Sequence, residues 1–211
     1  MQTFSSGETT TVVFDVDGVL IEPRFPQLLR TVLGVPAEKS EAFFRGPFLQ
    51  CLEGRAGLKP ALAAVLDDWG WSGTTDSFVD YWLQSDAQFD PAFVQLARRL
   101  GAAGYRCVVA SNQEHHRAQW LTQRLDMFPA LYFSCALGCR KPELAFFQAV
   151  RRSLGLAASE LLLLDDQAVN VAAAQADGWQ AVVCRAGDDV DALAIRCGLR
   201  LSPQDLYARP R

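Results

Sequence analysis

The sequence has no excess of basic residues and no long hydrophobic run, and both absences exclude classes of function. Lys and Arg number 20 against 24 Asp and Glu, giving a formal net charge of −4, which offers no support for nucleic-acid binding. No apolar segment approaches the about 20 residues that cross a membrane. Residues 1–10 carry neither the basic start nor the apolar stretch of a signal peptide. We therefore expect a cytoplasmic protein with no nucleic-acid and no membrane partner.

The cysteines lack the spacing of a metal site. Cys135 and Cys139 are four residues apart, but no second close pair completes a zinc site. Most cysteines lie within or beside apolar segments, as small core residues do. We expect six reduced thiols: Cys51, Cys107, Cys135, Cys139, Cys184 and Cys197.

The most informative stretch is Thr9–Leu20, in which a short apolar segment ends in two acids. Thr11–Phe14 is too short for a helix and predicts a buried strand of a parallel sheet. Asp15 and Asp17 then project to the same side as the strand ends, and Gly18 permits a sharp turn. This pattern places two carboxylates at the edge where open α/β sheets hold their ligands.

Two adjacent carboxylates allow several interpretations. They can hold Mg²⁺, which prefers oxygen ligands. Alternatively, one can attack phosphorus while the other transfers a proton. A calcium loop fits poorly, because Val19 stands where such a loop has a third acid. A solvated, Asp-rich turn remains the ordinary alternative.

Residues 22–88 differ from the rest of the chain because they contain no strong strand pattern. Apolar residues recur there at helical spacing, and several are aromatic. Gly and Pro separate the segments. We predict a four-helix insertion with an aromatic core, its helices covering residues 26–33, 36–44, 58–69 and 78–83.

From residue 90 onward, helical segments alternate with apolar strands. This alternation predicts right-handed βαβ units. The predicted fold class is therefore α/β, a doubly wound, parallel, Rossmann-like sheet with an inserted four-helix cap domain. Residues 1–21 and 89–211 would form the core, and residues 22–88 the cap. We expect the later strands near residues 105–110, 131–135, 161–164 and 180–184.

Four polar groups follow strands of this predicted sheet, so they should meet at its carboxyl edge. Three of them also have ordinary explanations, as a helix N-cap, an exposed loop lysine and a helix cap of acids. All of these explanations would have to hold at once, which favours a single site. The groups are Asp15 with Asp17, Ser111 with Asn112, Lys141, and Asp165 with Asp166.

The combination has a chemical logic. Asp15, Asp165 and Asp166 offer oxygen ligands for Mg²⁺, and without a metal their proximity would raise at least one pKa. Lys141 offsets negative charge, and the Ser111 hydroxyl can donate to a phosphate. Together these groups would stabilise the charge on a transferring phosphoryl group.

In this order the motifs resemble those of the haloacid dehalogenase superfamily of phosphatases, over about residues 11–185. The insertion resembles the helical cap of that family's first cap type. The last two motifs are most similar to those of sugar-phosphate phosphatases, such as α-glucose-1-phosphatase, and of the phosphatase domain of soluble epoxide hydrolase. The motifs are DVDGV (15–19), SN (111–112), RKPE (140–143) and LLDDQAVNVAAAQADGW (163–179).

The resemblance implies a role for each motif residue. Asp15 would be the nucleophile and form an aspartyl-phosphate. Asp17 would protonate the leaving oxygen and then take the proton from the attacking water. Ser111, Asn112 and Lys141 would bind the phosphoryl group and the substrate.

The resemblance also implies a bound Mg²⁺. Its ligands would be the Asp15 carboxylate, the Asp17 backbone carbonyl and Asp166. Asp165 would contact the ion directly, through water, or hold Lys141 instead. Asn170 would steady the turn that carries the two acids.

Dehalogenases of this superfamily lack an acid at the position of Asp17, because a halide leaves without a proton. We therefore predict a Mg²⁺-dependent phosphomonoester hydrolase acting on a small phosphorylated metabolite, with sugar phosphates favoured by the resemblance. Arg24 and Arg55 are expected to bind the substrate, with solvated surface arginines as the alternative. A phosphomutase or phosphotransferase of the same fold and a catalytically silent regulatory protein stay open. We expect a monomer or a weak homodimer.

Overall fold

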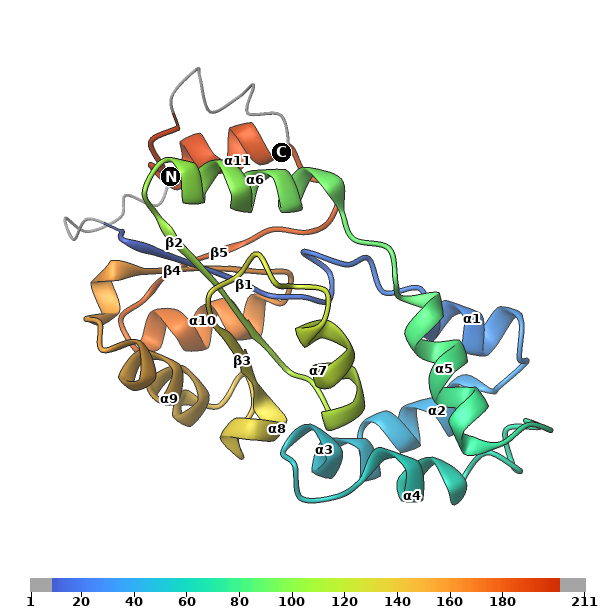
Figure 1. Ribbon diagram of the computed structural model, residues 1–211. Coiled ribbons are helices and arrows are strands. Elements are labelled where there is room, and N and C mark those ends of the chain that lie inside the picture. The colour runs from blue at the N-terminus through green and yellow to red at the C-terminus, as the bar shows by residue number, and fades with distance from the viewer. Residues whose placement is uncertain (1–8, 202–211) are drawn as a thin grey trace.

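A five-stranded parallel sheet forms the centre of the computed structural model, which describes residues 9–201 (Figure 1). The strand order is β3-β2-β1-β4-β5. This arrangement confirms the predicted doubly wound, Rossmann-like α/β sheet. Residues 1–8 and 202–211 of the predicted core lie outside the described residues. The first of these ranges holds most of the segment in which no signal peptide was expected. The strands are β1 (Thr11–Phe14), β2 (Arg106–Ser111), β3 (Leu131–Phe133), β4 (Leu161–Asp165) and β5 (Gln180–Val183).

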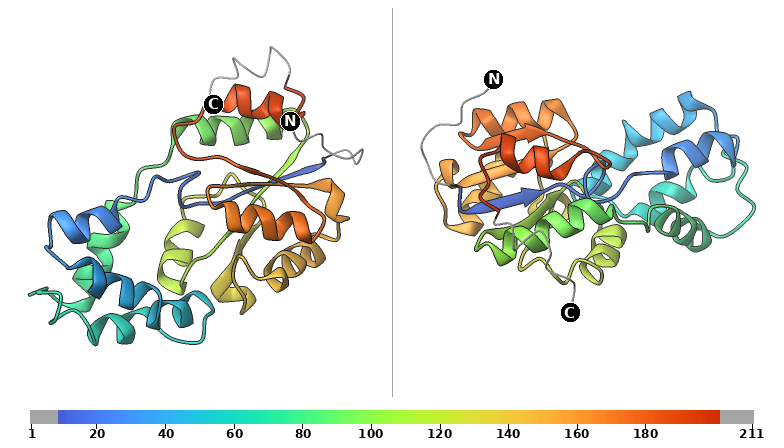
Figure 2. Two further views of the ribbon diagram at one scale, coloured as in Figure 1. Left: turned by 180° about the vertical axis from the view of Figure 1, so that it is seen from behind. Right: turned by 90° about the horizontal axis from the view of Figure 1, so that it is seen from above.

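Helices cover both faces of the sheet (Figure 2). Strand side chains alternate between the faces, so Phe14 joins the hydrophobic cluster on one side and Val13 the cluster on the other. The first cluster is completed by α6 (Pro91–Ala102), α7 (His115–Thr122) and α11 (Val190–Arg196). The second is completed by α9 (Leu144–Leu154) and α10 (Ala168–Ala176), and the short 3₁₀ turn η1 (Ala158–Glu160) leads into β4.

The segment between β1 and α6 consists of helices that lie to one side of the sheet (Figures 1 and 2). These helices share a hydrophobic cluster of their own. Its centre is aromatic, with the rings of Phe25 and Trp82 stacked 4.6 Å apart between centroids. The helices are α1 (Phe25–Thr31), α2 (Ala37–Phe44), α3 (Pro47–Leu52), α4 (Leu58–Ala63) and α5 (Thr75–Ser85).

The structure differs from the predicted elements in several places. The helix predicted over residues 58–69 ends at Ala63. The insertion has five helices rather than four, because Gly46 and Pro47 end α2 but also begin α3. Proline is well tolerated in the first turn of a helix, where its missing N–H is not needed. The strand predicted over residues 131–135 ends at Phe133, and α8 (Ser134–Leu137) follows. There the backbone N–H of Cys135 donates to the Gln113 carbonyl (3.3 Å), a tertiary contact that local sequence does not reveal.

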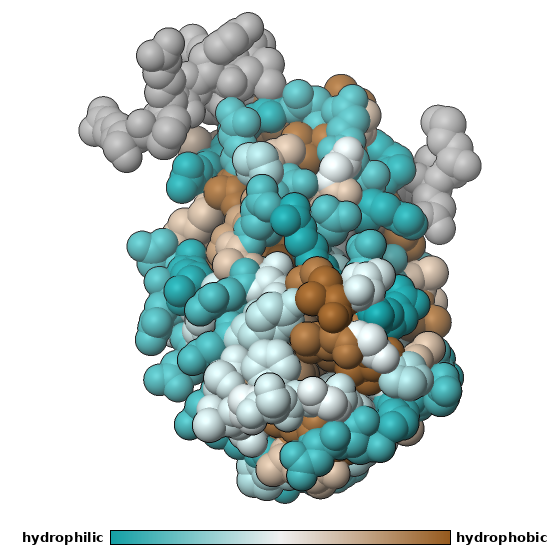
Figure 3. Space-filling model, turned by 90° about the vertical axis from the view of Figure 1, so that its right-hand side faces the viewer, coloured by the Kyte–Doolittle hydropathy of each residue, from teal (hydrophilic) through white to brown (hydrophobic). Residues whose placement is uncertain are grey.

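The surface on the side of α1–α5 is mostly polar or neutral, with one cluster of hydrophobic residues near the middle of that view (Figure 3). Within residues 9–201, no helix combines the length and the apolar character needed to cross a membrane. All six cysteines are free thiols, as predicted.

Candidate active site

The predicted polar groups meet at the carboxyl edge of the sheet. Asp15 directly follows β1, Ser111 ends β2 and Asp165 ends β4. Because β1 lies between β2 and β4, the three residues come from neighbouring strands. The strand order changes direction between β1 and β4, and ligands of open α/β sheets bind at such a switch point.

Lys141 is the residue that joins two of these strands. Its Nζ lies 2.8 Å from an Asp15 carboxylate oxygen and 2.6 Å from one of Asp165. The lysine is only 2 % exposed, so the alternative of an exposed loop lysine is wrong. The side chain of Asn112 fixes this loop, because its oxygen accepts from the Lys141 N–H (2.8 Å) and its NH₂ donates to the Lys141 carbonyl (2.9 Å).

Burial and charge oppose each other in this cluster. The pKa of Asp15 is raised to about 7, because desolvation by burial and the nearby Asp165 charge together outweigh the lowering effects of Lys141 and the Ser111 hydroxyl. Burial alone would lower the pKa of Lys141, but the attraction of Asp15 and Asp165 outweighs it and the pKa is raised. Lys141 therefore keeps its proton. Two carboxylates share one ammonium, and the cluster favours a further cation.

An acidic cluster at this edge has the composition of a hard-cation site. Asp15, Asp165 and Asp166 each offer a carboxylate oxygen, and these atoms lie within 4.8 Å of one another. Asp166 is half-buried, and burial raises its pKa. A Cβ at Gly18, which has φ +82°, would overlap the Asp166 side chain. The loop after β1 thus approaches Asp166 as closely as a glycine allows, and the oxygen donors fit Mg²⁺.

Protein donors occupy both carboxylate oxygens of Asp165, as they do those of Asp15, whose oxygens accept from the Val16 N–H (2.7 Å) and from Lys141. One oxygen of Asp165 accepts from Lys141 (2.6 Å), and the other from the Gln167 N–H (2.9 Å) and the Asn170 side chain (2.9 Å). Of the three arrangements left open for Asp165, this geometry favours the one in which it holds Lys141. Asn170 lies where the resemblance implied, against the turn that carries the acids.

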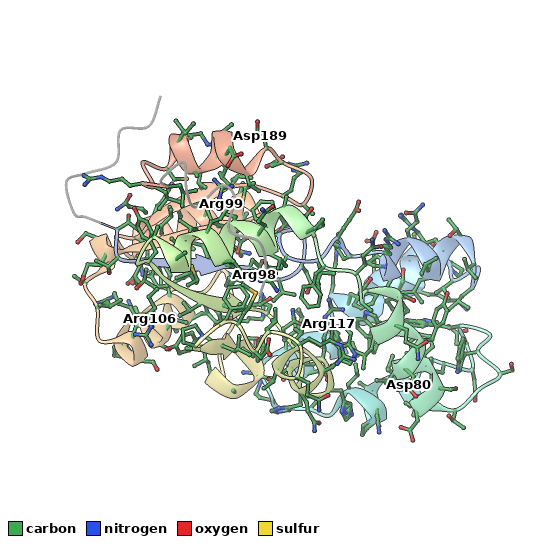
Figure 4. All side chains as sticks on the ribbon, turned by 45° about the horizontal axis from the view of Figure 1, so that its top comes forward. Asp80, Arg98, Arg99, Arg106, Arg117 and Asp189 are labelled. Carbon is green, nitrogen blue, oxygen red and sulfur yellow. The ribbon has the colours of Figure 1, made fainter. Side chains whose placement is uncertain are left out.

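Asp17 lies at the mouth of the site, with its side chain 37 % exposed, and two unpredicted residues hold it. The guanidinium of Arg117 contacts one carboxylate oxygen (2.5 Å), and the amide of Gln113 donates to the other (2.8 Å). Arg117 also contacts Asp86 (3.0 Å), which in turn accepts from two backbone N–H groups at the start of α1, those of Arg24 and Phe25 (2.7 and 2.9 Å). Figure 4 shows Arg117 between the core and the insertion.

Only weak sequence signals could have found these partners. Gln113 follows the Ser111–Asn112 motif directly, and Arg117 lies one helical turn later on α7. Asp86 stands just before the chain returns to the core. None of the three belongs to a motif, and the pairing of Arg117 with Asp17 spans 100 positions.

The two arginines predicted to bind the substrate lie elsewhere. Arg24 is exposed, and only its backbone N–H takes part in the network around Asp86. Arg55 is also largely exposed and pairs with Glu53 and Gln50. A cavity of about 230 Å³ opens beside Asp17, and neither arginine lines it. The buried Glu53 instead binds Arg140 of the core (3.0 Å), which ties α3 to the loop that carries Lys141.

Residues 9–178 match the family model of the haloacid dehalogenase-like hydrolases. The chain belongs to this family. Its fold is similar to that of a HAD family enzyme, bt-2542, from Bacteroides thetaiotaomicron, solved with magnesium and inorganic phosphate (TM-score 0.74, 22 % identity, 89 % of this chain and 99 % of that one). It is also similar to L-2-haloacid dehalogenase from Xanthobacter autotrophicus (TM-score 0.62, 20 % identity, 94 % and 86 %).

A curated relative of this HAD-like hydrolase is the sesquiterpene phosphatase astK of Aspergillus oryzae. The two sequences are 30 % identical over 92 residues, which make up 42 % of this chain. The matched stretch spans about half of that relative, 47 % of its length.

Replacing Lys141 with Met should destabilise the fold strongly, because the substitution leaves two buried carboxylates without their cation. We expect the free energy of unfolding to fall by about 3–5 kcal/mol, measured by urea denaturation with divalent ions chelated. Lys59→Met is the matched control. Lys59 pairs with Asp76 on the exposed surface, so its loss should cost less than about 1 kcal/mol. A Lys141→Met protein as stable as the wild type would contradict the charge pairing described for the cluster.

Proposed function

We propose that this HAD-like hydrolase is a Mg²⁺-dependent phosphatase that hydrolyses phosphate monoesters through an aspartyl-phosphate. The observation that carries the proposal is the contact of the buried Asp15 with Lys141 beside two further acids, with Asp17 held at the mouth of the same site. The name of the sesquiterpene phosphatase relative supports this assignment.

In the first step, a carboxylate oxygen of Asp15 attacks phosphorus and forms the new O–P bond. The bond to the alcohol oxygen breaks, and that oxygen takes a proton from Asp17. In the second step, Asp17 takes a proton from water, whose oxygen attacks the phosphorus. The bond between phosphorus and the Asp15 oxygen breaks, so inorganic phosphate leaves and the Asp15 carboxylate is restored. Using one carboxylate as acid and then as base is ordinary for a two-step displacement.

The surrounding residues have distinct roles in this scheme. Lys141 neutralises charge at Asp15 and on the phosphoryl oxygens, and the Ser111 hydroxyl donates to the phosphoryl group. Because both polar atoms of the Asn112 side chain are engaged by Lys141, we assign Asn112 to positioning that lysine rather than to binding the substrate. Arg117 orients Asp17.

Asp15 and Asp166 would hold the Mg²⁺, together with the backbone carbonyl of Asp17. When bound, the ion supplies positive charge that stabilises the transferring phosphoryl group. We further propose that residues 22–88 act as a cap domain over this site. The Glu53–Arg140 and Asp86–Arg117 ion pairs support the seating of these helices on the core.

Replacing Asp15 with Asn should remove the nucleophile and abolish turnover. We expect release of inorganic phosphate to fall by about 10³-fold or more, with an unchanged circular dichroism spectrum. Asp80→Asn, which alters an exposed acid of α5 (Figure 4), should leave the rate unchanged. An Asp15→Asn enzyme that still releases phosphate would overturn the assignment. Recovery of an isomerised sugar phosphate from the wild type would instead favour a mutase.

Replacing Asp166 with Asn should weaken Mg²⁺ binding, because hard-cation affinity follows the charge of the ligand set. Isothermal titration of the protein with Mg²⁺ alone should show an affinity lower by about tenfold or more. Asp80→Asn again serves as the control and should bind Mg²⁺ as the wild type does. Equal affinity of Asp166→Asn and the wild type would remove Asp166 from the ligand set.

Replacing Arg117 with Gln should lower kcat more than it changes KM, because Asp17 loses its orienting partner while the phosphoryl site is intact. A decrease of about 10- to 100-fold is expected, part of the about 10²–10⁴-fold that a positioned acid contributes. Arg98→Gln, on the exposed side of α6 (Figure 4), is the matched control. An unchanged kcat in a folded Arg117→Gln enzyme would show that Arg117 does not position the acid.

A further inference from the structure

The cavity of about 230 Å³ beside Asp17 opens between the carboxyl edge of the sheet and the helices of the insertion. This volume is somewhat below the about 300–1,000 Å³ that is typical of small-molecule sites, and it suits a small substituent. Asp17 is the residue to which we assign protonation of the leaving oxygen. The cavity therefore lies where the alcohol part of a bound phosphate ester would project.

The walls of this cavity are mostly apolar. Nine of its fifteen lining residues are apolar, and all nine belong to the insertion or the segment leading into it. The rings of Phe44, Phe48 and Trp82 contact one another, with centroids 5.3–5.8 Å apart. Trp82 is backed by the stacked ring of Phe25. Leu52, the last residue of α3, adds an aliphatic surface.

The polar side chains that line the cavity are committed to protein contacts. Glu114 caps α7 and accepts from two of its backbone N–H groups (2.5 and 2.8 Å). Asp86 binds Arg117 and the start of α1. Asn112 binds the backbone of Lys141 on both polar atoms.

The remaining three polar side chains bind one another, since the Gln113 amide and the Arg117 guanidinium both donate to Asp17. Arg117 Nε has no hydrogen-bond partner, but it is buried away from solvent. A sugar placed in this cavity would exchange the water around its hydroxyls for aromatic and aliphatic walls. Each hydroxyl left without a partner costs the equivalent of about 5- to 150-fold in binding.

We propose that the cavity binds the alcohol part of the substrate and that this alcohol is apolar, so that the enzyme acts on phosphate monoesters of hydrocarbon-rich alcohols rather than on sugar phosphates. This inference rests on the proposed phosphatase function. It departs from the sugar-phosphate preference that the sequence motifs suggest, because those motifs belong to the core and the cavity walls belong to the insertion.

The decisive comparison is between cyclohexylmethyl phosphate and glucose 6-phosphate, which share a six-membered ring and a primary phosphate ester but differ in the hydroxyls and ring oxygen of the sugar. We expect kcat/KM for phosphate release to be at least about 100-fold higher for the first compound. Along ethyl, butyl and hexyl phosphate, kcat/KM should rise by about fourfold per methylene until the cavity is filled. Acetyl phosphate, whose leaving group is too small to fill the cavity, reports the core chemistry.

The outcomes distinguish a failure of the proposed substrate class from a failure of the proposed phosphatase function. Equal or better hydrolysis of glucose 6-phosphate, or a flat alkyl series, overturns the substrate class while acetyl phosphate hydrolysis still supports the phosphatase. Failure to hydrolyse every compound, acetyl phosphate included, overturns both.

A matched pair of variants tests the wall directly. Leu52→Asn places an amide in the cavity and should lower the ratio of kcat/KM for hexyl phosphate to that for acetyl phosphate by about tenfold. Leu144→Asn makes the same change at an exposed position of α9 and should leave this ratio unchanged. An unchanged ratio in a folded Leu52→Asn enzyme would overturn the assignment of this wall to the substrate.

Discussion

A single buried ammonium group makes the central site possible. Asp15 and Asp165 end neighbouring strands and face each other in a region closed to water, where two unpaired carboxylates could not both stay ionised. Lys141 lies between them and contacts both. Its position depends on Asn112 through the backbone, so three strands and one loop are joined around one positive charge. The excess negative charge that remains suits both a hard cation and a mechanism in which the chain supplies the nucleophile.

The core could be predicted from sequence because one geometric rule governs it. In a parallel sheet every strand ends at the same edge, so acids and hydroxyls that follow strands converge without any knowledge of tertiary contacts. Asp15, Ser111 and Asp165 were predicted in this way. Prediction failed where a contact depends on two segments whose relative position no motif specifies, as for Arg117 with Asp17. It also failed at Pro47, since a break and a helix start look alike in sequence.

The insertion shows a different limit of prediction from sequence. Phe44, Phe48 and Trp82 fit the pattern of a helical core, and Trp82 does pack in that core. The same rings also face the cavity. Sequence patterns report that a side chain is apolar and periodic, not which part of it remains accessible. The core motifs therefore describe the phosphoryl chemistry, while the selection of the alcohol depends on side chains that look purely structural.

The network around Asp86 has a mechanical consequence. One carboxylate oxygen of Asp86 accepts hydrogen bonds from the backbone N–H groups at the start of α1. The other oxygen accepts from the guanidinium of Arg117, which also contacts Asp17. A displacement of α1 away from the sheet would also disturb the Asp86–Arg117 ion pair, and with it the contact between Arg117 and Asp17. The placement of α1 and the orientation of Asp17 therefore depend on the same buried carboxylate.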